Sequence, residues 1–209
     1  MQTGLVFGVL VLAFSAILHE VSHGYMANYL GDPTARLAGR LTLNPLKHID
    51  PVGSLILPAI LVATGSPILI GYAKPVPYNP YNLPGKYDEA LVAGAGPGVN
   101  ILLALVFSFF IRSLPAASPL APAFAAVAYI NMLLALFNLI PIPPLDGSKV
   151  LSAVLPGGLG RAYDASRFRF ERLGVLQGTL LILLIFYFLS PLFSAALAGL
   201  FSLLTGLSL

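Results

Sequence analysis

Long apolar segments recur through this chain, and they restrict its fold more than any other feature. The segments 89–111, 123–140 and 173–190 are almost free of charged side chains. A helix needs about 20 mostly apolar residues to cross the hydrocarbon core of a bilayer, and several windows meet that length. Only 9% of the residues are charged, against roughly 25% in a typical soluble domain. The sequence therefore predicts an all-α polytopic membrane protein.

Proline, glycine and polar loops divide the apolar sequence into about five to six transmembrane or re-entrant helices. Their predicted ranges are 4–31, 51–71, 89–111, 123–140, 173–190 and, behind Pro191, 191–207. A small extended or β edge is predicted after residue 66, at 68–76, where it would be able to pair with an unwound peptide. The proline-rich sequence before Leu145, Asp146 and Gly147 predicts a broken helix at that point.

Three ionisable residues lie inside the first apolar helix, where they are energetically costly. His19, Glu20 and His23 form an HExxH motif. A charged side chain at the membrane centre costs at least about 2.5 kcal/mol, so such residues are functional candidates. His19 and His23 are four residues apart and project from one helix face, which allows both neutral imidazoles to bind one zinc ion. Glu20 lies about 100° around the helix from His19, in the position of a general base beside that metal.

A catalytic zinc ion usually has three protein ligands, so one ligand must come from elsewhere in the chain. The chain contains no cysteine, so a thiolate ligand is excluded. Most acidic residues lie in polar loops or at segment ends, and the candidates for the third ligand are Asp146 and His48. Asp146 follows a helix break, and non-helical backbone at membrane depth is tolerated only inside protein or beside a wet cavity. Asp146 is also placed to cap the next helix, and Gly147 permits a sharp turn. His48 lies near Lys47 and Asp50 in a polar loop, as is typical of an interfacial residue.

The number of membrane crossings between the two motifs tests whether Asp146 can join the histidines. The segments 89–111 and 123–140 supply two crossings, and an even number returns the chain to the same depth. A third crossing by 51–71 would separate the motifs, so this segment is predicted to be re-entrant. All lysines and arginines except Arg112 then lie on one side. The positive-inside rule makes that side the cytosol, with the N-terminus outside and the metal site toward the cytosolic side.

Five motifs occur in order along the chain: HEVSHGY, LNPLKHIDPVGS, GYAKPVPYNP, GAGPGVN and FNLIPIPPLDG. Together they resemble the site-2 protease family, peptidase family M50, specifically its compact prokaryotic members without a PDZ or other appended domain. The resemblance covers about residues 15–155. It implies one Zn²⁺ ion per chain, bound by His19, His23 and Asp146. It also implies that Glu20 activates water to hydrolyse a peptide bond in or near a transmembrane segment of a membrane protein, as in regulated intramembrane proteolysis.

Two asparagines match polar residues of the same family. Asn138 precedes the LDG motif by two turns, and Asn100 lies in the central apolar helix. The resemblance implies that both bind substrate, whereas interhelical hydrogen bonding is the structural alternative for each. Gly94 and Gly98 are predicted to allow close helix packing.

Two other functions are consistent with parts of the sequence. An ion-coupled transporter also has broken helices and polar residues at membrane depth, but it predicts an inverted repeat that this sequence lacks. A catalytically silent homologue that only binds membrane proteins should lack the glutamate or a ligand, yet Glu20 and Asp146 are present. The net charge of +3 comes from scattered loop residues, not from a basic stripe, which argues against nucleic-acid binding.

The sequence thus predicts one membrane-embedded metalloprotease domain over residues 1–209, with a catalytic core at about 1–155 and C-terminal helices at about 173–207. The expected location is a prokaryotic cell membrane. The expected partners are the lipid bilayer and transmembrane protein substrates, and the oligomeric state is left open.

Overall fold

The computed structural model describes residues 2–56, 59–60, 63, 73–115, 117–172 and 175–208. Within these ranges the chain is helical, with no assigned β-strand. Four helices are long and apolar enough to cross a membrane: α1 (Gln2–Tyr29), α4 (Asp88–Ser113), α5 (Ala121–Asn138) and α8 (Val175–Thr205). The predicted all-α polytopic membrane fold is therefore confirmed.

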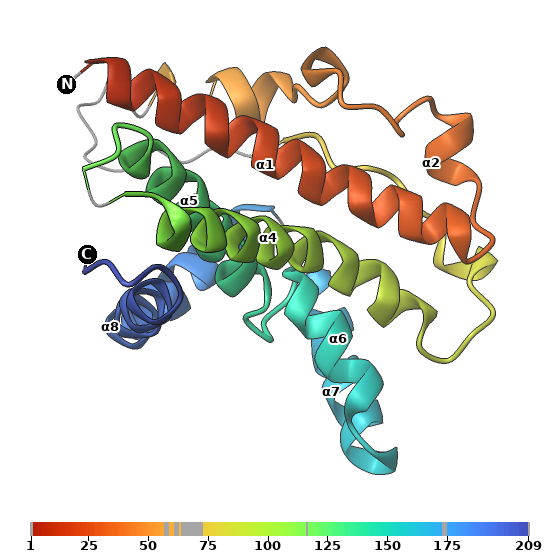
Figure 1. The fold of residues 1–209 in the computed structure, drawn as a ribbon. Coiled ribbons are helices and arrows are strands. Elements are labelled where there is room, and N and C mark those ends of the chain that lie inside the picture. The colour runs from red at the N-terminus through yellow and green to blue at the C-terminus, as the bar shows by residue number, and fades with distance from the viewer. Residues whose placement is uncertain are drawn as a thin grey trace.

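Helix α4 is central to the packing, because it contacts α1, α5, α6 and α8. Figure 1 shows α1 and α4 lying along each other, with α6 (Asp146–Val154) and α7 (Gly157–Glu171) extending away from them. An apolar cluster lies where α4, α5 and α8 meet. Its buried members are Ala104, Ile111, Ala128, Met132, Leu197 and Phe201.

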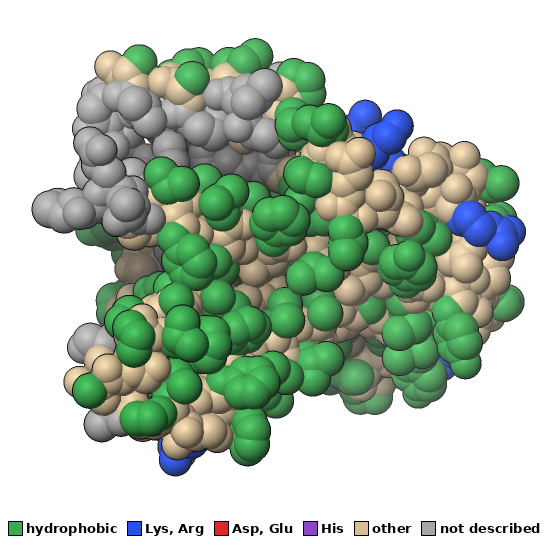
Figure 2. Space-filling model, turned by 45° about the horizontal axis from the view of Figure 1, so that its top comes forward, with side chains coloured by type: hydrophobic (Ala, Val, Ile, Leu, Met, Phe, Trp, Pro, Cys, Tyr) green, Lys and Arg blue, Asp and Glu red, His purple; other side chains and the backbone are tan. Residues whose placement is uncertain are grey.

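Many large apolar side chains outside this cluster are exposed. Figure 2 shows hydrophobic side chains spread over most of one face, with lysine and arginine side chains near its edges. At one end of the molecule, the Arg112 guanidinium donates hydrogen bonds to the backbone carbonyls of Leu203 and Leu204, both at 2.6 Å. This contact joins the last turn of α4 to the last turn of α8. A helix C-terminus with free carbonyls is a favourable place for a cation.

The C-terminal apolar sequence forms one helix, so the prediction of two helices at 173–190 and 191–207 is wrong. Pro191 lies inside α8, and it has no amide to donate to the carbonyl four residues earlier, at Tyr187. The Ser190 hydroxyl donates to that carbonyl instead, at 2.8 Å. Such local replacement of a lost donor allows a helix to continue through proline at membrane depth.

The helix break before Asp146 is confirmed. Helix α5 ends at Asn138, and residues 139–145 form turns before α6 begins at Asp146. Proline cannot supply amide donors for a continuing helix, and three prolines occupy this short stretch. The break brings the start of α6 beside α4, against which it packs.

The described residues that flank the segment 51–71 lie together. The Lys74 amide donates to the His48 carbonyl at 2.8 Å, and the Arg40 guanidinium donates to the Lys74 carbonyl at 2.8 Å. Residues 57–58, 61–62 and 64–72 lie outside the described residues. Because the chain at Lys74 is again beside His48, the described residues agree with the even number of crossings that the sequence requires.

The predicted β edge at 68–76 is not found in its described part, Ala73–Val76. The backbone amides there bond elsewhere: Lys74 donates to a loop carbonyl, and Val76 donates to the Glu20 carboxylate. These amides are therefore not used in a strand ladder within the described structure. Residues 68–72 lie outside the described residues.

A buried carboxylate fixes the chain that follows this segment. Asp32 is fully buried and accepts hydrogen bonds from the Thr34 hydroxyl, the Asn79 amide and the Asn82 side chain. Burial alone would raise the pKa of Asp32, but the hydrogen bonds from Thr34, Asn82 and Asn79 lower it below its ordinary value. Asp32 thus attaches residues 79–82 to the end of α1 as a carboxylate.

Candidate metal centre

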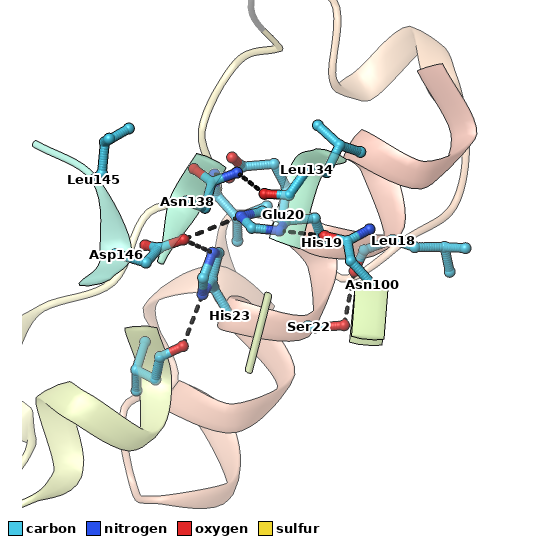
Figure 3. Close-up of polar contacts among 12 residues, drawn as sticks. Leu18, His19, Glu20, Ser22, His23, Asn100, Leu134, Asn138, Leu145 and Asp146 are labelled. Atoms are coloured by element: carbon cyan, nitrogen blue, oxygen red, sulfur yellow. Dashed lines mark hydrogen bonds and ion pairs between the residues drawn. The ribbon is translucent and has the colours of Figure 1, made fainter. Parts of the chain in front are cut away.

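Helix α1 places two histidines on one face, and the start of α6 places a carboxylate opposite them. His19 Nε2 lies 3.1 Å from Asp146 Oδ2, and His23 Nε2 lies 3.4 Å from the same oxygen. One ligand atom from each residue falls within 4.8 Å of the others. The three side chains are 8%, 11% and 14% exposed. Figure 3 shows both imidazoles directed toward Asp146.

The other nitrogen of each imidazole is held by α4. His19 Nδ1 lies 2.7 Å from the Asn100 side-chain oxygen, and His23 Nδ1 lies 2.7 Å from the Val92 carbonyl oxygen. A carbonyl oxygen only accepts, so each Nδ1 carries the proton and donates it. Nε2 of each imidazole is then the ring nitrogen that faces Asp146. Hydrogen bonds of this kind fix the tautomer and orientation of metal-binding histidines.

Asn100 belongs to a buried polar network that joins three helices. Its side-chain amide donates to the Asn131 oxygen at 2.8 Å, and the Asn131 amide donates to the Ser15 hydroxyl at 2.9 Å. Asn100 and Asn131 are fully buried. Asn100 contacts His19 and does not line the cavity in front of His19, His23 and Asp146; its role in substrate binding stays a prediction.

Sequence reasoning missed Asn131 and Ser15. A signal was present, because Asn131 is a polar residue in an otherwise apolar membrane helix, where polar groups require partners. Ser15 lies four residues before His19 and so shares its helix face. Nothing in the sequence pairs Asn131 with the metal centre, since that relation depends on how α5 packs against α4.

Gly96 of α4 is buried and lies against the imidazoles of His19 and His23. A β-carbon at this position would overlap His23 Nε2 and would lie 2.7 Å from His19 Cε1. Gly94 and Gly98 have no described atom within 4 Å of such a carbon. The prediction that these two glycines allow close helix packing is therefore wrong for the described residues. The glycine between them has that role, and it faces both imidazoles.

Gly147 has a comparable steric role beside Asp146. A β-carbon there would overlap the Leu139 carbonyl group and would lie 2.7 Å from the Ile140 carbonyl oxygen. Only glycine fits this close approach of α6 to the end of α5. Asp146 is the first residue of α6 and directly precedes this contact. The sequence prediction attributed Gly147 to a sharp turn, whereas the structure shows that its small size is what is required.

A cavity of about 210 Å³ is lined by His19, His23 and Asp146. Glu20, Tyr78, Asn138 and Lys149 also line it. Glu20 Oε2 accepts a hydrogen bond from the Val76 amide at 3.0 Å, which holds this carboxylate beside the histidines. Asn138 donates its side-chain amide to the Leu134 carbonyl at 2.9 Å, as Figure 3 shows.

Lys149 places a cation in the same cavity. Its ammonium lies 5.0 Å from the centre of the Tyr78 ring. Burial would lower the pKa of Lys149, but Tyr78 and the carboxylates of Asp146 and Glu89 raise it above its ordinary value. Lys149 is therefore a cation at neutral pH. Sequence reasoning missed both Tyr78 and Lys149, because neither residue belongs to a recognisable metal motif.

The structure thus brings His19, Glu20, His23, Asn138 and Asp146 to one cavity. His48, the alternative third ligand, does not line this cavity. It is 2% exposed, and its ring nitrogen Nε2 donates to the Thr42 carbonyl at 2.8 Å. His48 therefore stabilises the loop after α2 (Thr34–Leu37).

The donor set fits a zinc ion. Two neutral imidazoles and one carboxylate are the ligands of known catalytic zinc sites, which keep a further position for water or substrate. Because each Nδ1 is used in a hydrogen bond, Nε2 of His19 and Nε2 of His23 are the ring atoms available to bind the metal. Fold and site together define a class of protein: a polytopic membrane protein with a hydrolase-type metal centre.

Comparison with known proteins gives the family. The sequence profile of peptidase family M50 matches residues 112–185, which include Asp146. The chain is 37% identical over 162 residues to "Putative zinc metalloprotease YwhC" of Bacillus subtilis, covering 72% of this chain and 70% of that protein. A relative of the same description, Rip2 of Mycolicibacterium smegmatis, is 33% identical over 66% of this chain and 54% of its own length. No solved structure matches. The chain belongs to the site-2 protease family, peptidase family M50.

Proposed function

We propose that this chain is a zinc-dependent endopeptidase that hydrolyses peptide bonds in or near the transmembrane segments of membrane proteins. One observation carries the proposal: His19, His23 and Asp146 converge on a cavity between membrane helices, and Glu20 lines the same cavity. The names of the relatives, which describe zinc metalloproteases, support the choice of metal and reaction. The catalytic core proposed at about 1–155 contains all four residues.

Each of these residues has a different role in the proposed peptide hydrolysis. His19, His23 and Asp146 would hold the zinc ion, which when bound supplies Lewis-acid polarisation and lowers the pKa of water. The Glu20 carboxylate accepts a proton from the water that attacks the scissile carbonyl carbon, and it delivers that proton to the leaving amine. Asn100 and the Val92 carbonyl keep the imidazoles oriented through their hydrogen bonds.

The polar side chains in front of Glu20 are suited to hold an unwound substrate. Asn138 lines the cavity, and an amide side chain offers both a donor and an acceptor to a peptide backbone. Its bond to the Leu134 carbonyl uses an amide hydrogen. We assign Asn138 to substrate binding and Asn100 to positioning of His19.

Neither alternative function has a specific observation in its favour. A transporter needs no general base beside its metal ligands, whereas Glu20 lines the same cavity as all three. A catalytically silent homologue would lack part of this set. The complete set of ligands and base favours an enzyme.

The experiment is co-expression with a panel of single-span membrane proteins, followed by measurement of cleavage and of zinc in the purified protease. Glu20→Gln is expected to keep zinc and to lower cleavage by about a hundredfold to ten-thousandfold. Asp146→Ala is expected to lose both, because a ligand is removed. If no protein is cleaved in a Glu20-dependent manner and the purified protein holds no zinc, the proposal fails.

We further propose that the protein lies in a prokaryotic cell membrane with its N-terminus outside. The positive-inside rule supports this orientation, and the chain lacks cysteine, so single cysteines report accessibility. Tyr81 is 97% exposed, and Ala117 is exposed in the loop between α4 and α5. A membrane-impermeant thiol reagent added outside should label Ala117→Cys and not Tyr81→Cys. The reverse pattern would refute the orientation.

A further inference from the structure

A second cavity, of about 540 Å³, lies next to the catalytic one. Residues from the start of α4, from α6 and from α7 line it. Its charged lining residues are Lys86, Glu89, Lys149, Arg161, Asp164 and Arg167. Lys149 lines both cavities, so the two spaces share a cationic side chain. Four cations and two carboxylates give this second cavity an excess of positive charge.

The two carboxylates of the lining are already paired. Arg167 is 6% exposed, and its guanidinium lies 3.2 Å from Glu89 Oε1 and 3.6 Å from Asp164 Oδ1. Asp164 also accepts a hydrogen bond from the Ser152 hydroxyl. Within the described part of the chain, no ion pair joins Lys86, Lys149 or Arg161 to a carboxylate. These three cations are the ones that can meet an incoming anion.

Apolar side chains accompany the cations. Leu155 and Phe168 line the cavity, and Phe168 is 53% exposed. Two further side chains of α6 and α7, Val154 and Leu159, are 67% and 66% exposed. A free inorganic anion would contact only the cationic side chains of the lining. A ligand that carries both an anionic group and hydrocarbon would contact the cationic and the apolar side chains.

The position of this cavity in the chain points to the membrane surface. Helix α7 connects α6 to α8, whose Tyr187–Thr205 part is long and apolar enough to cross a membrane. Cationic segments next to a membrane helix attract anionic phospholipids, by about 1 kcal/mol per lysine or arginine. An acidic peptide would satisfy the cations but not the exposed apolar side chains beside them.

We propose that this cavity binds the phosphate headgroup of an anionic phospholipid, with Lys86, Lys149 and Arg161 around the phosphate. Leu155 and Phe168 contact the adjoining hydrocarbon. The site is separate from the metal ligands, and its occupation does not require proteolysis. Because Lys149 belongs to both cavities, the lipid phosphate would lie beside the catalytic cavity.

The test is reconstitution of the full chain in phosphatidylcholine nanodiscs, followed by titration with phosphatidylglycerol and native mass spectrometry of the bound lipid. The double variant Lys86→Gln/Arg161→Gln removes two exposed cations of the cavity. The matched control is Arg36→Gln/Lys47→Gln, which removes one exposed lysine and one exposed arginine elsewhere. Wild type and control should retain phosphatidylglycerol in preference to phosphatidylcholine. The cavity variant should bind it about 30-fold more weakly, or about fivefold per cation.

Four results would overturn the proposal. Equal loss in the cavity variant and in the control would show general surface attraction without a site. Displacement of bound phosphatidylglycerol by millimolar inorganic phosphate would show a site for small anions. Preferential displacement by a short polyglutamate peptide would assign the cavity to acidic protein segments. Retained lipid preference in the cavity variant would exclude Lys86 and Arg161 from the site.

Discussion

Replacement of Gly96 by alanine should weaken zinc binding without unfolding the protein. The added β-carbon would lie 2.7 Å from His19 Cε1 and would overlap the His23 ring. Non-bonded carbon atoms are most stable about 3.5–4.0 Å apart, so the rings or α4 must move by roughly 0.8 Å or more. A metal centre tolerates only about 0.5 Å of displacement. Disruption of the groups that orient metal-binding histidines typically lowers metal affinity about tenfold to hundredfold, and we expect a loss in that range.

The same helix supplies matched controls. A β-carbon at Gly94 or Gly98 has no described atom within 4 Å, so Gly94→Ala and Gly98→Ala should leave zinc affinity unchanged. Each should raise stability by up to about 0.5–1 kcal/mol, because alanine loses less entropy in a helix than glycine. Zinc affinity is measured by chelator competition, and stability by thermal unfolding. If Gly96→Ala binds zinc as tightly as Gly98→Ala, the steric reasoning about the imidazoles is wrong.

Three further substitutions test other contacts. Asn100→Leu removes the hydrogen-bond acceptor for His19 Nδ1 and should lower zinc affinity about tenfold to hundredfold. Unchanged zinc affinity in chelator competition would contradict the positioning role of Asn100. Val76→Pro removes the amide that donates to Glu20 and should slow cleavage about tenfold to hundredfold with zinc content unchanged; full activity would argue against this contact. The pKa of Asp32 is lowered in the folded state. Ionised Asp32 therefore stabilises the folded protein above about pH 4, and this stabilisation is lost as the pH falls through the folded-state pKa of Asp32. Acid-unfolding curves of Asp32→Asn should lack that loss, and a curve identical to wild type would refute the assignment.

The sequence was sufficient to predict the class of fold and five of the residues that line the cavity, namely His19, Glu20, His23, Asn138 and Asp146. Apolar length predicted the membrane helices, and the cost of ionisable groups at membrane depth singled out His19, Glu20 and His23. An even number of membrane crossings between the motifs placed these residues at the same depth as Asp146, more than a hundred residues away. These predictions rest on solvation and connectivity, which do not require the packing to be known.

The remaining features depend on packing, which the sequence does not show. Helix α4 is apolar on most sides, so its pattern does not reveal that Gly96 and not Gly94 or Gly98 faces the histidines. For the same reason, the sequence did not predict which side chains Asn100 contacts. The break predicted at Pro191 was wrong because the prediction did not include the Ser190 hydroxyl, which bonds the freed carbonyl.

Val92, Gly96 and Asn100 are spaced four residues apart and lie on one face of α4, and all three contact the histidines of α1. Sliding α4 by one residue, about 1.5 Å along its axis, would break both hydrogen bonds and move Gly96 away from the two imidazole rings. Zinc affinity is therefore linked to the mutual register of α1 and α4. By the same linkage, bound metal resists any sliding of the two helices, and any displacement of α4 would weaken metal binding.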